Sequence, residues 1–159
     1  MLGPLKQWIC DSCGEIINSA EDGWVEWLDN GGGFNSCYGF KIVHNDGSSP
    51  RGKGGCFHYS EKQGPSDIQL DFFMGDKGYV YLLSFLDLGP IVIPEYEGPR
   101  VKDIREFIEF MRRLTIPYYE EARMFFKEAL ADGDLDPSSV DMIYDPEDLK
   151  KIVKKYGKE

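Results

Sequence analysis

Apolar residues recur at helical spacing over much of the second half of the chain. Residues 101–114 carry one such stripe, which predicts an amphipathic helix with an inner face of Val101, Ile104, Phe107, Ile108, Met111 and Leu114. A second stripe predicts a helix that begins at Pro117 and ends before Gly133. Asp145 and Pro146 suit the cap and the first position of a helix, so we expect a last helix to begin there.

Shorter elements are expected before these helices. Ser66 is a suitable N-cap for a short helix over residues 67–74. Residues 79–88 fit either a helix or a strand, and Asp76 as a cap favours the helix. Residues 90–94, which read Pro-Ile-Val-Ile-Pro, predict an extended segment.

The first part of the chain has the pattern of a β-hairpin. Gly23–Asp29 predicts one strand, and Cys37–Val43 predicts the returning strand. Residues 30–35 between them are rich in glycine, which suits a turn. Residues 45–66 then form a long segment rich in Gly, Ser and Pro. An irregular segment of this length is uncommon in a compact domain unless something holds it in place.

Composition places the chain among folded globular proteins. It has 159 residues, of which 42% are hydrophobic and 14% aromatic, whereas disordered chains are poor in both classes. This length fits one domain. We therefore predict an α+β fold in which a β-rich module, residues 1–65, packs on a mainly helical region, residues 66–159, in one compact unit.

Charge and the N-terminal sequence narrow the classes of function. The chain carries 18 basic and 28 acidic side chains, a net charge of -10, and an acidic chain repels polyanions, which disfavours nucleic-acid binding over a large face. No membrane partner is expected, because the apolar stretches are too short to span a bilayer. Residues 1–8 lack the pattern of a signal peptide, so we predict a cytoplasmic location. In that reducing compartment the cysteines are expected to be thiols or metal ligands.

Cys10 and Cys13 are the residues that most clearly indicate chemistry. Two thiolates in a C-x-x-C turn can hold one zinc ion, and Gly14 after them lets the backbone fold round the metal. All 4 Cys and 2 His residues of the chain lie within the first 58 positions. This clustering favours a metal site over a set of unrelated buried thiols.

A closed tetrahedral zinc site needs two further ligands. His44 ends the second predicted strand, and Cys56 follows two glycines that permit a tight turn. The predicted Zn2+ ligands are therefore Cys10, Cys13, His44 and Cys56. His58 is an alternative to His44 or Cys56, and Cys37 is a further substitute, although Cys37 also suits a small buried position on its strand.

The segment Trp8–Gly14 resembles the knuckles of zinc-ribbon and rubredoxin-like domains. The resemblance covers seven residues and implies a bound zinc ion. Zinc ribbons often contact nucleic acids or proteins, and many only hold a fold together. Those families usually repeat the C-x-x-C knuckle, whereas here the second half would be the irregular group His44, Cys56 and His58.

Two other segments approach known sites and depart from them. Residues 47–54 contain G-x-x-x-x-G-K, but Gly54 stands where a phosphate-binding loop needs Ser or Thr, and no helix is expected after it. The spacing of Asp132, Asp134 and Asp136 matches the first ligand positions of a calcium-binding loop. However, Pro137 stands where that loop needs glycine. We expect neither nucleotide nor calcium at these segments.

The predicted function follows from a metal site that four protein ligands can close. A closed site is structural, because a catalytic zinc ion keeps one position open for water. We therefore predict a non-enzymatic zinc protein, with an interaction or regulatory role toward an unidentified protein partner. One alternative is a nucleic-acid-associated zinc module that uses the basic residues Arg51, Lys53, Lys150, Lys151, Lys154, Lys155 and Lys158. A second is a metal-dependent hydrolase with Asp46 or Glu61 as its base.

Overall fold

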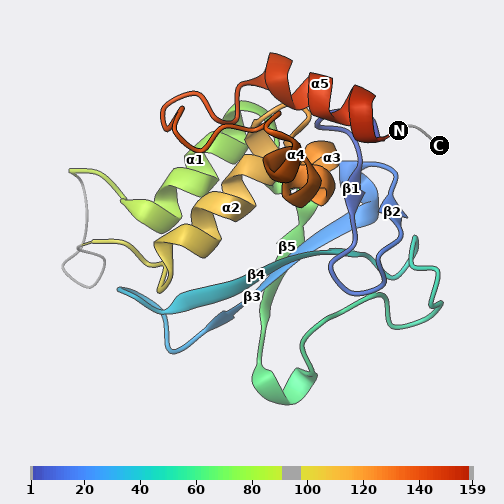
Figure 1. The fold of residues 1–159 in the computed structure, drawn as a ribbon. Coiled ribbons are helices and arrows are strands. Elements are labelled where there is room, and N and C mark those ends of the chain that lie inside the picture. The colour runs from blue at the N-terminus through green and yellow to red at the C-terminus, as the bar shows by residue number, and fades with distance from the viewer. Residues whose placement is uncertain (1, 91–97, 158–159) are drawn as a thin grey trace.

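The structure, a computed structural model, describes residues 2–90 and 98–157 (Figure 1). It combines small antiparallel sheets with helices, which confirms the predicted α+β class. The helices lie together on one side of a three-stranded sheet (Figure 1). The predicted extended segment at residues 90–94 falls mostly outside the described residues.

The predicted hairpin forms the centre of this sheet. Strand β3 (Gly23–Asp29) pairs antiparallel with β4 (Cys37–His44), with a register shift between Glu26 and Leu28. The sheet order is β4-β3-β5, so β3 has a partner on both sides. Its mostly buried residues therefore lie in the middle of the sheet rather than at an open edge.

The third strand, β5 (Ser66–Gln69), corrects the helix that the sequence predicted over residues 67–74. These residues pair antiparallel with β3, for example Ile68 with Val25, and this pairing satisfies backbone groups of β3 that would otherwise face solvent. A 3₁₀ turn, Leu70–Phe73, follows and buries the side chains at both of its ends in the core.

Five α-helices are present among the described residues: α1 (Gly75–Leu86), α2 (Ile104–Thr115), α3 (Tyr119–Ala122), α4 (Phe126–Asp132) and α5 (Pro146–Tyr156). The helical interpretation of residues 79–88 is thus correct, and the helix begins earlier than expected. Within the described ranges, no helix combines the length and the hydropathy that a bilayer crossing requires.

Capping explains where two of the predicted helices begin. The Asp103 side chain accepts hydrogen bonds from the backbone N–H groups of Arg105 and Glu106, so α2 begins at Ile104. Val101, which the apolar stripe included, instead forms an isolated bridge with Cys37. The Asp145 side chain accepts from the Glu147 N–H at the start of α5, as its sequence predicted.

The helix predicted from Pro117 to Gly133 is not continuous. It begins after Tyr118, which has a positive φ of 66°, and a 3₁₀ turn, Arg123–Phe125, separates α3 from α4. Phe125 departs from helical geometry (φ −105°, ψ 2°), and its ring stacks on that of Tyr156 with centroids 6.2 Å apart. Packing against α5 therefore accompanies the break. Gly133 ends α4 in the left-handed conformation, as expected.

Buried apolar residues form two clusters. The first cluster contains residues from before and after the predicted module boundary at residue 65. At its centre the Phe40 ring contacts the rings of Trp27, Phe85, Phe107 and Phe110. The second joins α3, α4 and α5 around Tyr119, Ala122, Ala129, Leu149, Ile152 and Val153. The division of the chain into modules at residue 65 stays a prediction.

Glu26 anchors the long irregular segment to the sheet. Its side chain is fully buried, and Oε1 accepts a short hydrogen bond from the backbone N–H of His58. The next residue, Tyr59, donates its hydroxyl to the Gly39 carbonyl at 2.5 Å. Oε2 of Glu26 has no hydrogen-bond partner among the residues that the structure describes. The segment after β4 is thus held by polar contacts at residues 58 and 59.

The Glu26→Gln variant is expected to lose less stability than the wild type as the pH rises. Burial raises the pKa of the Glu26 carboxyl, and the His58 and Tyr59 amides only partly offset this. A carboxyl whose pKa is raised in the folded state contributes most to the free energy of unfolding below its ordinary pKa of about 4.3. This contribution is lost as the pH rises through the raised pKa. Urea unfolding at a series of pH values from about 4.5 to about 7 measures the difference.

Glu61→Gln is the matched control, because Glu61 is exposed on the same irregular segment. Its profile should follow that of the wild type. Equal declines in the free energy of unfolding for wild type and Glu26→Gln would show that Glu26 does not titrate in this range.

Candidate metal centre

Four side chains converge at one end of the three-stranded sheet. The ligand atoms of Cys10, Cys13, His44 and Cys56 all lie within 4.8 Å of one another. They come from three separate parts of the chain: the turn after β1 (Trp8–Ile9), the end of β4 and the long segment after it. The structure thus brings together the same four residues that the sequence singled out, in a group that could hold a metal ion.

The distance between the Cys13 sulfur and the His44 ring nitrogen suits a shared tetrahedral ion. Cys13 Sγ lies 3.5 Å from His44 Nδ1. A Zn–S bond of about 2.3 Å and a Zn–N bond of about 2.05 Å at a tetrahedral angle place the two donors about 3.6 Å apart. The two donors are therefore already close to the separation that a shared zinc ion requires.

The orientation of His44 also suits a ligand. Its Nε2 lies 3.1 Å from the Ile16 carbonyl oxygen, on strand β2 (Ile16–Ile17). A carbonyl accepts only, so this contact places the ring proton on Nε2 and leaves the Nδ1 lone pair toward the cysteines. Such an outer hydrogen bond is typical of metal-bound histidine. The ring is only 3% exposed, which limits competition from water.

The thiols influence one another's ionisation. Burial raises the pKa of Cys10, but hydrogen bonds from the Cys13, Ser12 and His44 backbones lower it to about 7. Burial and the neighbouring sulfurs of Cys10 and Cys56 raise the pKa of Cys13 to about 11. One thiolate thus forms readily and disfavours a second beside it. A divalent cation would remove this penalty, because it stabilises all three thiolates together.

The backbone of the turn has the shape that a metal knuckle needs. The Gly14 N–H donates to the Cys10 carbonyl at 2.9 Å, and Gly14 has a φ of +81°. Asp11 fixes the turn to β4, since its N–H donates to the Ile42 carbonyl and its Oδ2 accepts from the Ile42 N–H, both at 2.8 Å. The two-residue strands β1 and β2, which the sequence did not predict, pair at the base of this turn.

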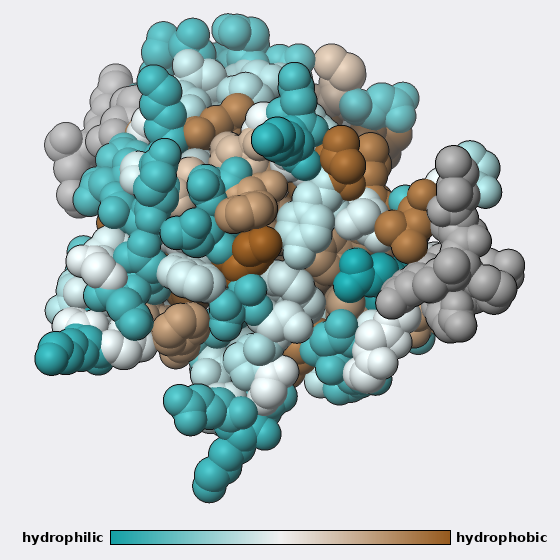
Figure 2. Space-filling view, turned by 180° about the vertical axis from the view of Figure 1, so that it is seen from behind, coloured by the Kyte–Doolittle hydropathy of each residue, from teal (hydrophilic) through white to brown (hydrophobic). Residues whose placement is uncertain are grey.

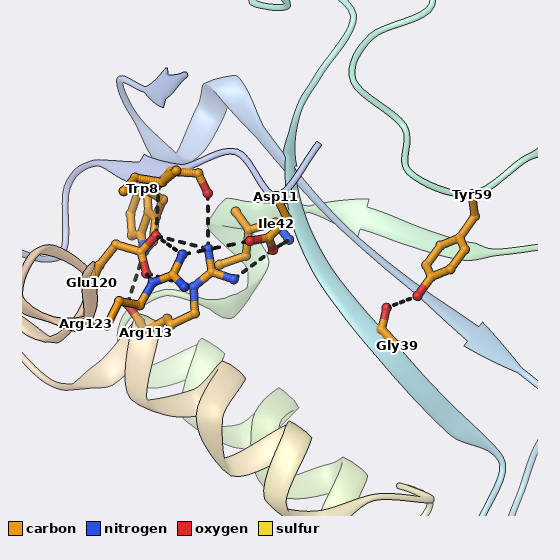
Figure 3. Close-up of polar contacts among 9 residues, drawn as sticks. Trp8, Asp11, Gly39, Ile42, Tyr59, Arg113, Glu120 and Arg123 are labelled. Atoms are coloured by element: carbon orange, nitrogen blue, oxygen red, sulfur yellow. Dashed lines mark hydrogen bonds and ion pairs between the residues drawn. The ribbon is translucent and has the colours of Figure 1, made fainter. Parts of the chain in front are cut away.

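A buried ion network ties the same turn to the helices (Figure 3). Arg113 of α2 donates to Asp11 Oδ2 at 2.7 Å and to Glu120 Oε2 of α3 at 2.7 Å. Arg113 and Glu120 are 6% and 2% exposed. Arg123 also donates to Glu120 at 2.8 Å, and Glu120 Oε1 accepts from the Ile9 N–H. The position of the turn is therefore coupled to the junction of α2 and α3.

The two substitute ligands do not join the group. Cys37 is fully buried at the opposite end of β4 from His44, which is about 23 Å along an extended strand. Its sulfur contacts Ser36 and Asp29 instead, at 3.6 and 3.7 Å. His58 is exposed, and its ring packs edge-on to Tyr59 with centroids 5.0 Å apart.

Neither carboxylate proposed as a hydrolytic base lies within the donor group, which contains no carboxylate among the residues that the structure describes. Asp46 and Glu61 are both exposed. Asp46 lies beside Gly55 instead. A Cβ atom at position 55 would lie only 2.7 Å from Asp46 Oδ1. Gly55 has a φ of +62°, so glycine suits the position before Cys56 both in conformation and in space.

The basic residues that could serve a nucleic acid are partly engaged within the chain. Arg51, in the near-match to a phosphate-binding loop, donates to the side chain and carbonyl of Ser12 at 3.0 and 2.9 Å. On α5, Lys151 pairs with Asp148 at 2.7 Å, and Lys155 pairs with Asp134 at 2.5 Å. Both lysines are therefore paired with acidic residues of the chain itself.

Sequence reasoning missed the groups that position the four donors. The Ile16 carbonyl orients His44, and Asp11 fixes the knuckle to both β4 and α2. Asp11 lies inside the C-x-x-C turn, so its acidic side chain at that position was the available signal. Its partner Arg113 lies 102 positions away, and no local pattern connects the two.

The four residues form a Cys3His group, and the sequence has no second C-x-x-C knuckle beside it. The group could hold a metal ion and is compatible with zinc. Comparisons of the chain with protein-family models, with curated proteins and with solved structures found no match.

Proposed function

We propose that this chain binds one structural Zn2+ through Cys10, Cys13, His44 and Cys56, and that the surface assembled around it binds another protein. The observation that carries the proposal is the convergence of these four ligand atoms, within 4.8 Å of one another, from three segments of the chain. Through its coordination bonds, zinc would connect the N-terminal knuckle, the end of β4 and the long irregular segment.

The donor set favours zinc over harder cations. Three thiolates and one imidazole are the ligands of structural zinc sites, whereas Mg2+ and Ca2+ prefer oxygen donors. The four donors close a tetrahedral shell, so water would have no position at the metal. A structural role follows more directly from this set than hydrolysis does, and thiolates also weaken zinc as a Lewis acid.

Exposed apolar residues support a role in protein binding. Helix α1 presents Tyr79, Val80 and Leu83, which are 50%, 72% and 54% exposed. Hydrophobic residues are also visible in groups among hydrophilic ones on the face seen in Figure 2. Exposed apolar groups of this kind are common at protein–protein interfaces.

The metal content of purified protein tests the proposal directly. Protein prepared without added zinc is expected to hold about one zinc ion per chain by elemental analysis, because four protein donors bind this ion tightly. Replacement by Co2+ should give intense sulfur-to-cobalt charge-transfer bands and the visible spectrum of a tetrahedral ion. Cys37→Ser is the matched control and should leave both results unchanged, since Cys37 lies outside the group.

Two results would contradict the proposal. Folded protein without metal, which also takes up no Co2+, would make the three cysteines ordinary buried thiols. A cobalt spectrum typical of five-coordination would instead indicate an open position and return attention to hydrolysis.

A further inference from the structure

A cavity of about 380 Å³ lies between the metal knuckle and the C-terminal helices. This volume is at the small end of the range for ligand pockets. Its walls are mostly apolar. Residues that line it include Ile9, Ile16, Glu121, Met124, Phe125 and Val153.

Glu121 is the charged residue of this lining that stands out. It is only 4% exposed, and its Oε1 has no hydrogen-bond partner among the described residues. The preceding residue, Glu120, is equally buried but bonds to Arg113, Arg123 and the Ile9 N–H. A buried carboxyl oxygen without a partner is costly, and burial accordingly raises the pKa of Glu121. A ligand that offered a cation would remove this cost.

We infer that this cavity receives a lysine side chain from an apolar segment of a partner protein, with the lysine ammonium bound by Glu121. The inference rests on the proposed function in that it names the chemistry of the protein partner. An ammonium group suits the site because a single unpartnered oxygen can satisfy a point charge, whereas arginine binds a carboxylate best through both oxygens. The apolar walls suit the methylene stem of lysine.

The surroundings of the cavity fit a protein segment with apolar residues beside the lysine. Ile16 and Met124 line the cavity and remain 46% and 61% exposed, so they offer apolar contacts at its mouth. Methionine adapts readily to different partners. The net charge of -10 would also attract a basic partner at long range.

The cavity depends on the knuckle for one of its walls. Gly14 and Ile16 line it from the knuckle side, and the Ile16 carbonyl is the group that orients His44. Phe125 and Val153 line it from the side of the C-terminal helices. The binding test therefore uses protein as purified, with its metal content measured on the same sample.

The test compares two peptides that differ in one group. The probe is acetyl-Gly-Leu-Lys-Leu-Gly-amide, and its control carries norleucine in place of lysine, which keeps the stem and removes the ammonium. NMR titration of isotope-labelled protein is expected to show shifts around Ile9, Ile16 and Glu121 with the lysine peptide. Binding of the norleucine peptide should be about 10- to 100-fold weaker, because a charge-assisted hydrogen bond is lost.

Glu121→Gln should remove the preference for lysine without unfolding the protein, since glutamine has the same shape and no charge. Glu128→Gln is the matched control, because Glu128 is exposed on α4 and removes the same charge from the surface. This variant should keep the preference. Thermal unfolding of both variants checks that the fold is intact.

Four outcomes would overturn the inference. Equal binding of the two peptides, or an unchanged preference in Glu121→Gln, would exclude the ammonium–carboxylate contact. Binding that appears only after residues 158–159 are deleted would mean that Lys158 of the chain itself competes for the site, against an external partner. Failure of peptide binding in protein with one zinc ion per chain would reject this inference and leave the structural zinc proposal intact.

Discussion

Replacing Cys56 with serine is expected to lower the free energy of unfolding by about 4 kcal/mol or more, which is a large share of the stability of a typical domain. Cys56 is the only proposed ligand that the long irregular segment supplies. Without it, the metal would lose both a thiolate and its connection to that segment. Because the proposed zinc ion would bind the folded arrangement and not the unfolded chain, lost affinity for zinc would appear directly as lost stability.

Urea unfolding and native-state hydrogen exchange measure this effect. Exchange is expected to speed up most in the knuckle and in the segment after β4, while the second apolar cluster, formed by α3, α4 and α5, should keep more of its protection. A chelator should destabilise the wild type in the same way and have little further effect on Cys56→Ser. Cys37→Ser provides the control, because Cys37 is equally buried and lies outside the donor group. Equal stability of the two variants would mean that no metal contributes to folding.

Features determined by nearby residues were predictable from the sequence. The α2 helix follows from its apolar stripe, and α5 follows from the cap at Asp145 and the proline after it, all of which act within a few turns. The hairpin of β3 and β4 follows from two apolar strands and a glycine-rich turn between them. In these cases, residues within the segment are enough to specify its helix or hairpin.

Strand β5 shows where local patterns were not enough. Ser66–Gln69 has only four residues, and Ser66 is also a good helix cap, so its sequence suits a helix start. Its strand conformation comes from the free edge of β3, a partner about 40 residues earlier in the chain. The break between α3 and α4 has a similar origin, because Phe125 packs on Tyr156 of α5.

The grouping of Cys10, Cys13, His44 and Cys56 was predictable for a chemical reason. The C-x-x-C turn limited the site to one end of the chain, and only four other Cys or His residues were available to complete it. The choice between Cys56 and His58 depended on the path of the long segment. That path is fixed by contacts of its residues 58 and 59 with Glu26 and Gly39, which no periodicity records.

Replacing Arg113 with methionine is expected to lower the free energy of unfolding by about 3 kcal/mol. Methionine keeps much of the stem packing but leaves the buried Glu120 and the half-buried Asp11 with Arg123 as their remaining cation (Figure 3). Removing one member of a buried ion network is costly because the charges left behind cannot regain water. Affinity for the proposed zinc ion should also fall, since Asp11 lies inside the knuckle and loses its bond to Arg113.

Arg112→Met is the control, because Arg112 is the neighbouring residue on α2 and makes a partly exposed ion pair with Glu109 at 3.7 Å. Such pairs contribute about 0 to 1 kcal/mol.

The pH dependence of stability distinguishes the charge network from simple packing. Burial alone would raise the pKa of Glu120, but bonds and charges from Arg113 and Arg123 hold it below its ordinary value. Glu120 therefore stabilises the wild type above about pH 4.3, and this contribution is lost as the pH falls through the lowered pKa. Without Arg113, burial should raise the Glu120 pKa and reduce or reverse this dependence, whereas an unchanged acid profile in Arg113→Met would mean that the arginine acts only through its packing.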